Sequence, residues 1–316
     1  MSSQKGKGME PFVRRSHLLV SARDEAQVDR SWKQAADAVI LDLADTVPEV
    51  GKPPARANIK AAIPVAARGG AEVFVRINKD LAYADIIASA WPGLTGVVLT
   101  GAETAADVEE VATSLAAAEK EHGIANGSLS IIVMLDSGKG VWNIRQIITA
   151  SPRVCSVGLD EGRLCCHLGI VPTPAFDPFV YAKGRVIIES RAAQRQPVGI
   201  SHPAGLFPHC DDPEERYRLA LRSKNIGFAG VMCPDPSWVE SCNRALTPSD
   251  ERLEFYRDTR RLFAEGIARG TAAIPYPGTT MMIDVPVDER ARLTLALWER
   301  CAARDAEKRA ALARLT

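Results

Sequence analysis

The sequence predicts an α/β protein, specifically a (β/α)8 TIM barrel with a helical C-terminal extension. Eight short runs rich in Val, Ile and Leu alternate with amphipathic helical stretches, a pattern typical of parallel strands that are covered on both faces. The first run is followed by Val20-Ser-Ala-Arg23 rather than by a glycine-rich phosphate-binding fingerprint. These observations favour a closed barrel over an open nucleotide-binding sheet.

The eight expected strands are short β-branched runs separated by helix-length segments. Apolar runs of this length, bounded by turn residues, are typical of buried parallel strands. They are His17–Val20, Ala38–Asp42, Glu72–Arg76, Gly96–Leu99, Ser130–Leu135, Val154–Val157, Pro197–Ile200 and Gly227–Met232.

Helix-start signals fall between these runs. A helix is expected from about Glu25, Thr104 is a candidate N-cap for a helix over Ala105–Glu121, and Asp212-Pro213 begins another with an acidic first turn. Thr247-Pro248 opens a helical region that is surplus to eight β–α units. We therefore expect a barrel over residues 1–246 and a helical extension over 247–316.

The composition indicates a soluble globular protein. Its 316 residues are 46% hydrophobic and 25% charged, and its 39 Lys plus Arg balance 39 Asp plus Glu. Binding of nucleic acid or of an anionic membrane depends on clustered excess Lys and Arg, so we expect neither partner.

The seven cysteines indicate a reducing compartment. Their number is odd, their spacing is irregular and no C-x-x-C motif occurs, so neither a disulfide framework nor a zinc ribbon is expected. The polar segment 1–10 contains no apolar signal-peptide core. We therefore expect a cytoplasmic location.

Polar side chains gather where the expected strands end. Because the active site of a TIM barrel lies at the carboxyl ends of its strands, these residues are candidates for chemistry. Several carboxylates beside one Arg suit a hard cation such as Mg²⁺ together with a carboxylate substrate. The candidates are Asp42, Asp45, Arg76, Asn78, Asp136, Asp160 and Glu161.

Several motifs, in order and at similar spacing, carry a resemblance to a known family. The segments are Arg15-Ser16, Leu41-Asp-Leu-Ala-Asp45, Val75-Arg-Ile-Asn78, Leu135-Asp-Ser-Gly-Lys-Gly-Val-Trp-Asn143, Gly158-Leu-Asp-Glu161, Leu246-Thr-Pro-Ser249 and Met282-Ile-Asp-Val-Pro286. In these the chain resembles the HpcH/HpaI aldolase and citrate lyase beta-subunit family, more closely its citrate lyase-like branch.

The resemblance implies a Mg²⁺-dependent carbon–carbon lyase (Mn²⁺ being an alternative metal) that acts through an enolate on an acyl-CoA or oxo-acid substrate. It implies that Asp136 and Glu161 are ligands of the metal. It also implies that Arg76, Asp136 and Asp42 bind a small carboxylate substrate. It makes Asp284 an acid or base that reaches a neighbouring subunit's site, with Arg76 as the second catalytic residue. CoA would enter only as part of a substrate.

The resemblance also implies an exchanged tail, so we expect a homo-oligomer, most simply a trimer, with a hexamer as the other expectation. His202 and His209 match no family motif and are interpreted as loop histidines.

Departures from the family pattern leave alternatives open. Asp and Glu are exchanged at the two metal positions, so Asp160 is an alternative ligand to Glu161. The family's Glu is Ala44 here and its fourth-strand Lys is replaced at Gly101, which bears on whether CoA esters are used. The alternatives are an HpaI-type aldolase on free 2-oxo acids and a non-catalytic metabolite-binding paralogue.

Overall fold

The computed structural model describes residues 12–173, 176–199 and 210–315. The described chain divides into two compact units, one comprising Arg14–Leu246 together with the end of the chain from Lys308, and the other Thr247–Glu307. His202 and His209 lie outside the described residues.

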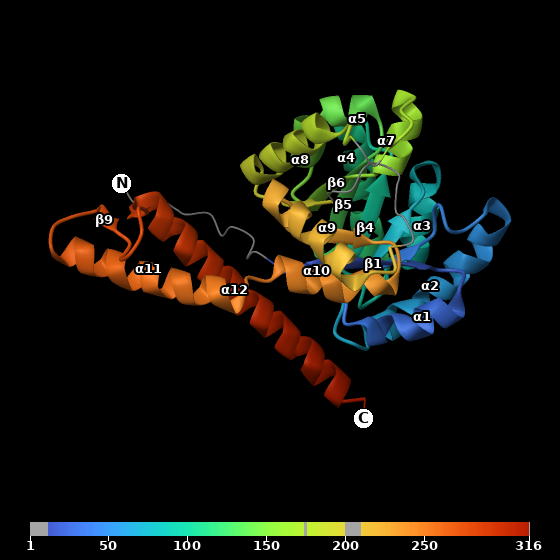
Figure 1. The fold of residues 1–316 in the computed structure, drawn as a ribbon. Coiled ribbons are helices and arrows are strands. Elements are labelled where there is room, and N and C mark those ends of the chain that lie inside the picture. Colours follow the sequence, from blue (N-terminus) through green and yellow to red (C-terminus); the bar gives the residue numbers. More distant parts are fainter. Residues whose placement is uncertain (1–11, 174–175, 200–209, 316) are drawn as a thin grey trace, which may run out of the picture. The chain divides into compact units, whose positions relative to one another are not determined.

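The first unit is an eight-stranded parallel barrel surrounded by helices (Figure 1), which confirms the predicted fold class. The strand order β7-β6-β5-β4-β3-β2-β1-β8 follows the chain around the barrel. The strands are β1 Ser16–Ser21, β2 Ala38–Asp42, β3 Glu72–Ile77, β4 Gly96–Thr100, β5 Ser130–Leu135, β6 Val154–Leu159, β7 Gln196–Val198 and β8 Val231–Cys233.

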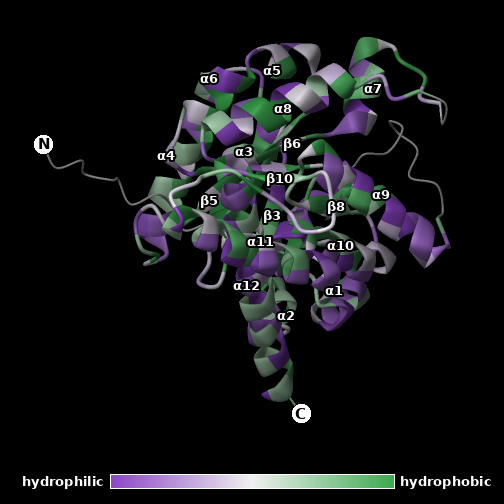
Figure 2. Cartoon of the chain, turned by 60° about the vertical axis from the view of Figure 1, so that its left-hand side comes forward, coloured by the Kyte–Doolittle hydropathy of each residue, from purple (hydrophilic) through white to green (hydrophobic). Residues whose placement is uncertain are grey.

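The described part of this unit contains ten α-helices, which pack on or beside the strands. Residues such as Val39 and Leu41 of β2 are fully buried in one apolar cluster with Ile59 and Ile63 of α2. The residues of α1 and α9 are largely hydrophilic (Figure 2). The helices are α1 Glu25–Ser31, α2 Lys52–Ala67, α3 Ala82–Ser89, α4 Ala105–Glu121, α5 Gly138–Trp142, α6 Ile144–Thr149, α7 Glu161–Leu168, α8 Val180–Ala192, α9 Pro213–Ile226 and α10 Val239–Leu246.

Short contacts on both sides of β8, to β1 and to β7, close the barrel. β1 pairs with β8 from Ser16 to Leu18, and a parallel bridge joins Val198 to Gly230. A Cβ at Gly230 would lie 2.4 Å from the carbonyl oxygen of Arg14, so only glycine fits this approach. The predicted start of the last strand at Gly227 was wrong, because Gly227, with φ +126°, ends α9 and the strand begins at Val231.

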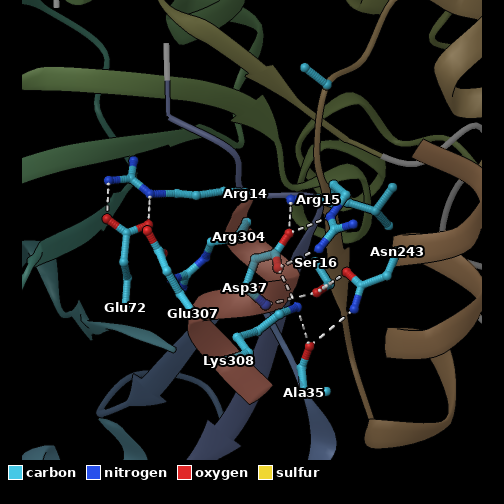
Figure 3. A network of polar contacts seen from close by, with 12 residues as sticks. Arg14, Arg15, Ser16, Ala35, Asp37, Glu72, Asn243, Arg304, Glu307 and Lys308 are labelled. Carbon is cyan, nitrogen blue, oxygen red and sulfur yellow. Dashed lines mark hydrogen bonds and ion pairs between the residues drawn. The ribbon is translucent and has the colours of Figure 1, made fainter. Parts of the chain in front are cut away.

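A buried polar network lies at the amino-terminal ends of the strands, opposite the expected site (Figure 3). The Asp37 carboxylate is fully buried and accepts hydrogen bonds from the Arg15 side chain at 2.7 and 2.9 Å. It also accepts one from Lys308 Nζ, near the end of the last helix, at 2.6 Å. Because the charges are paired with good geometry, their burial is tolerated.

The second unit is a helical hairpin with a small β-ribbon between its helices. It comprises α11 Asp250–Ala268, the antiparallel strands β9 Ile274–Pro275 and β10 Met282–Ile283, and most of α12 Val285–Ala313. Arg260 Nη1 pairs with Asp288 Oδ2 at 2.6 Å, which ties the two helices together. No helix in the described ranges is both long and apolar enough to cross a membrane.

Candidate active site

Asp42 and Arg76 form the most buried pair at the mouth of the barrel. Strand register places them opposite each other at the ends of β2 and β3. Arg76 donates from Nε to Asp42 Oδ1 at 2.6 Å and from Nη2 to Asp42 Oδ2 at 2.8 Å. The two Asp42 oxygens also accept from the backbone N–H groups of Ala44 and Thr46, both at 2.9 Å. The Asp42 carboxylate is fully buried and both of its oxygens are occupied by these four donors. Asp42 therefore holds Arg76 in one orientation and does not itself face a substrate.

A second group forms where β5 and β6 end. The backbone N–H of Asp160 donates to the carbonyl of Leu135 at 2.9 Å, which places Asp160 beside Asp136. Burial and the neighbouring charges of Asp160 and Glu103 raise the pKa of the Asp136 carboxyl, against the opposing effect of Arg163. Asp160 also caps α7 by accepting from the Arg163 N–H at 3.1 Å. Asp136 and Asp160 are therefore two close carboxylates that form no ion pair with a described residue.

Glu161 lies in the same turn but its side chain has a different partner. Its Oε1 is 3.1 Å from Nζ of Lys183 in α8, and that ammonium group also binds Asp177 at 2.7 Å. Oε2 of Glu161 is buried without a hydrogen-bond partner among the described residues. Burial raises the pKa of Glu161 to about 7, with help from Asp177 and Asp160 and against the charge of Lys183.

Asp45 and Arg163 connect opposite sides of the mouth. Asp45, in the loop after β2, accepts from Arg76 Nη2 at 3.0 Å and pairs with the guanidinium of Arg163, in the first turn of α7. Sequence reasoning did not select Arg163. Its one available signal was its place in the helical turn that follows the end of a strand, three residues after Asp160.

At the end of β4 the chain has Gly101 where the family pattern has Lys. Gly101 has φ +77°, and Lys79, in the loop after β3, crosses this position and donates to the carbonyl of Gly101 at 2.9 Å. Lys79 also pairs with Asp107 at 3.0 Å, and Lys139 pairs with Glu103 at 3.2 Å.

The charges around the mouth can be compared with what Mg²⁺ requires. Asp136 and Asp160 remain after Asp42, Asp45, Glu103 and Asp107 have paired with the surrounding Arg and Lys side chains. Within the described residues no three His, Cys, Asp or Glu side chains form a metal site. Mg²⁺ needs only one or two protein carboxylates and keeps water and substrate on its other positions. The unpaired Asp136 and Asp160, with the unpartnered Glu161 oxygen nearby, therefore fit the ion.

An open cleft of about 760 Å³ lies on the same side of the barrel. Its lining includes Ser21, Thr46 and Pro234, from the ends of β1 and β8 and the loop after β2. Its lining includes none of Arg76, Asp136 and Asp160, so this cleft is separate from the charged groups described above.

Asp284 lies in the other unit and caps α12. Its Oδ1 accepts from the N–H of Val287 at 3.1 Å, and the residue is partly exposed. The described residues therefore give Asp284 a local structural role.

Comparison with known proteins identifies the family. The model of the HpcH/HpaI aldolase/citrate lyase family matches residues 15–236. The chain belongs to this family. The beta subunit of citrate lyase from Leuconostoc mesenteroides subsp. cremoris is 27% identical over 90% of this chain and 93% of its own length. An L-malyl-CoA/beta-methylmalyl-CoA lyase from Rhodobacter capsulatus is 26% identical over 84% and 89%, respectively.

A solved structure supports the fold assignment. The protein CitE from Mycobacterium tuberculosis, crystallised with magnesium, acetoacetate and coenzyme A, superposes with a TM-score of 0.68 at 23% identity. The match covers 90% of this chain and 97% of that one. The family expected from the sequence motifs is confirmed.

Proposed function

We propose that this protein is a Mg²⁺-dependent carbon–carbon lyase that acts through an enolate on an acyl-CoA or oxo-acid substrate. Family membership and the lyase names of its relatives support the reaction class. The observation that carries the proposal is the meeting of Asp136 and Asp160 at the mouth, where the charge of Asp160 also acts on Arg76. The relatives named as lyases do not favour the HpaI-type aldolase or the non-catalytic alternative.

The chain's own residues would divide the work as follows. Asp136 would hold the metal, with Asp160 or Glu161 as the second carboxylate. A bound Mg²⁺ supplies positive charge beside the oxygen on which negative charge develops. Arg76, held in one orientation by Asp42, would donate to a substrate carboxylate or carbonyl oxygen, a planar recognition that Lys does not reproduce.

The choice between Glu161 and Asp160 depends on Lys183. Glu161 already shares the Lys183 ammonium with Asp177 at hydrogen-bond distance, whereas Asp160 forms no ion pair with a described residue and lies beside Asp136. We therefore favour Asp160 as the second ligand, with Glu161 contributing its unpartnered oxygen only if its side chain turns away from Lys183.

The assembly belongs to the proposal as well. We propose a homotrimer in which Asp284 reaches a neighbouring subunit's site as acid or base. Asp284 lies at the start of α12, beside the exposed Met282 and Val285. We also propose a cytoplasmic location, which the seven free cysteines support.

Titration calorimetry with Mg²⁺ tests the metal site. Asp136→Ala should abolish Mg²⁺ binding and lyase activity and leave the free energy of unfolding without metal nearly unchanged, because the Asp136 carboxylate forms no ion pair within the described chain. Asp212→Ala, at the N-cap of α9, is the control that should keep Mg²⁺ affinity. Unchanged Mg²⁺ affinity in Asp136→Ala would contradict the proposal.

Subunit mixing tests the shared site. Inactive Asp136→Ala and inactive Asp284→Ala proteins should regain activity when their subunits exchange, because some hybrid sites then hold both intact residues. The absence of recovery after verified exchange, or a monomer with full activity, would contradict the role of Asp284 in a neighbouring subunit.

A further inference from the structure

Arg163 differs from Arg76 in how its charge is engaged. The Arg76 side chain is 11% exposed and holds Asp42 and Asp45. The Arg163 side chain is 52% exposed and pairs with Asp45, which is itself 39% exposed. Among the described residues, Nη1 of Arg163 has no hydrogen-bond partner, and a guanidinium group can donate five hydrogen bonds. Arg163 is therefore the more accessible guanidinium at the mouth.

Arg163 also lies close in the chain to Asp160, which is proposed as a metal ligand. Its backbone N–H donates to Asp160 at 3.1 Å. The charges of Asp160 and Asp136 both act on its guanidinium, and that guanidinium in turn opposes the rise in the pKa of Asp136. The Arg163 guanidinium, bound to Asp45 beside Arg76, therefore lies near enough for its charge to act on the proposed site.

Asp45 can give up Arg163 without becoming an unpaired charge. It keeps its 3.0 Å contact with Arg76 Nη2 when Arg163 turns away. Burial alone would raise the pKa of Asp45, but the hydrogen bond from Arg163 and the charge of Arg76 outweigh it. Asp45 therefore stays ionised and occupies Arg163 with a carboxylate while substrate is absent.

We propose that Arg163 is a specificity residue that binds the second carboxylate of a dicarboxylic substrate, and that Asp45 holds its place in the free protein. The inference rests on the proposed function, because it takes the first carboxylate or the carbonyl oxygen of the substrate to be bound by Arg76. The proposal thus assigns the discrimination between dicarboxylic and monocarboxylic substrates to Arg163 and Asp45 of this chain.

The proposal predicts that substitutions of Arg163 and Asp45 change the affinity for a dicarboxylate in opposite directions. Arg163→Gln removes the guanidinium group that binds the second carboxylate, so binding of a dicarboxylate should weaken. Asp45→Asn removes the competitor, so binding of the same dicarboxylate should strengthen. If the ion pair served only to stabilise the loop after β2, both substitutions would break the same contact and act in the same direction.

The experiment measures binding by calorimetry with pairs of acids matched in carbon number. Oxaloacetate is compared with 2-oxobutyrate, and 2-oxoglutarate with 2-oxopentanoate, each with and without saturating Mg²⁺. In the unaltered protein at least one dicarboxylate should bind about tenfold more tightly than its partner, the effect of one charge-assisted contact. Arg163→Gln should remove this preference, and Asp45→Asn should increase it several-fold.

Arg218→Gln is the matched control. Arg218 is an exposed helical arginine, paired with Glu215 on α9, and its loss should leave the preference unchanged. Chemical unfolding of each variant verifies that it is folded.

The proposal is overturned if the unaltered protein shows no preference in either pair, if Arg163→Gln retains the preference, or if Asp45→Asn reduces it. Failure of the proposed function has a separate signature. A protein that binds no Mg²⁺ contradicts the metal-dependent reaction, whereas the preference ratios without Mg²⁺ still decide the role of Arg163.

Discussion

Replacing Asp42 by Asn tests whether the buried carboxylate holds Arg76 in place. In the native protein Oδ1 accepts from Arg76 Nε and the Ala44 N–H, and Oδ2 accepts from Arg76 Nη2 and the Thr46 N–H. An Asn side chain has one acceptor oxygen and one NH2 group. Whichever way the amide is oriented, its NH2 faces two donors, and two of the four hydrogen bonds are lost.

The magnitude follows from these contacts and from burial. A buried donor left unpaired costs about 1–3 kcal/mol, and removing one partner of a buried ion pair costs about 3–5 kcal/mol in all. Arg76 keeps Asp45 at 3.0 Å, which limits the loss. We therefore expect Asp42→Asn to lower the free energy of unfolding by about 3 kcal/mol.

Urea unfolding followed by circular dichroism measures this change. Asp24→Asn is the matched control, because Asp24 caps α1 through a single hydrogen bond to Gln27 N–H at 3.0 Å and Asn caps a helix about as well as Asp. A loss below about 1 kcal/mol in Asp42→Asn, or an equal loss in the control, would refute the reasoning.

Two further predictions concern the binding of substrate by Arg76 and the dependence of stability on pH. Arg76→Lys should weaken binding of oxo acids in the presence of Mg²⁺ by about tenfold or more, because an ammonium group cannot reproduce the planar fork; calorimetry measures it, and unchanged affinity would remove Arg76 from the site. Burial, helped by the charge of Arg14 and opposed by Asp37, lowers the pKa of His17 to about 3. A depressed folded-state pKa gives stability that is present above the unfolded value near 6.5 and is lost as pH falls toward 3. The raised pKa of Glu161 acts in the opposite direction in this window, because a protonated Glu161 favours the folded state as pH falls below 7. The contribution of His17 is therefore read as the difference in unfolding free energy between the native protein and His17→Leu, which should fall by up to about 1.4 kcal/mol per pH unit between pH 6.5 and 4; a difference that does not change with pH would contradict the prediction.

The sequence by itself determined the barrel and the side of the barrel on which chemistry is expected. Apolar runs of strand length separated by helical segments leave few other arrangements. Parallel register then carries the residues that end adjacent strands to one edge, which is why Asp42 lies opposite Arg76 and Asp136 lies beside Asp160. The family motifs contain the same strand-end residues, and the resemblance in these motifs indicates the reaction class.

Only the tertiary structure decided what each polar side chain binds. Asp42 was expected to bind substrate, but its carboxylate accepts hydrogen bonds from four donors of the protein. Glu161 was expected to bind the metal, but its carboxylate pairs with Lys183 of α8. Arg163 joins Asp45 across 118 positions of the chain. Local sequence patterns fix where a residue lies on its strand or helix, but the direction and partner of a long charged side chain depend on which groups the closed barrel brings within a few ångströms.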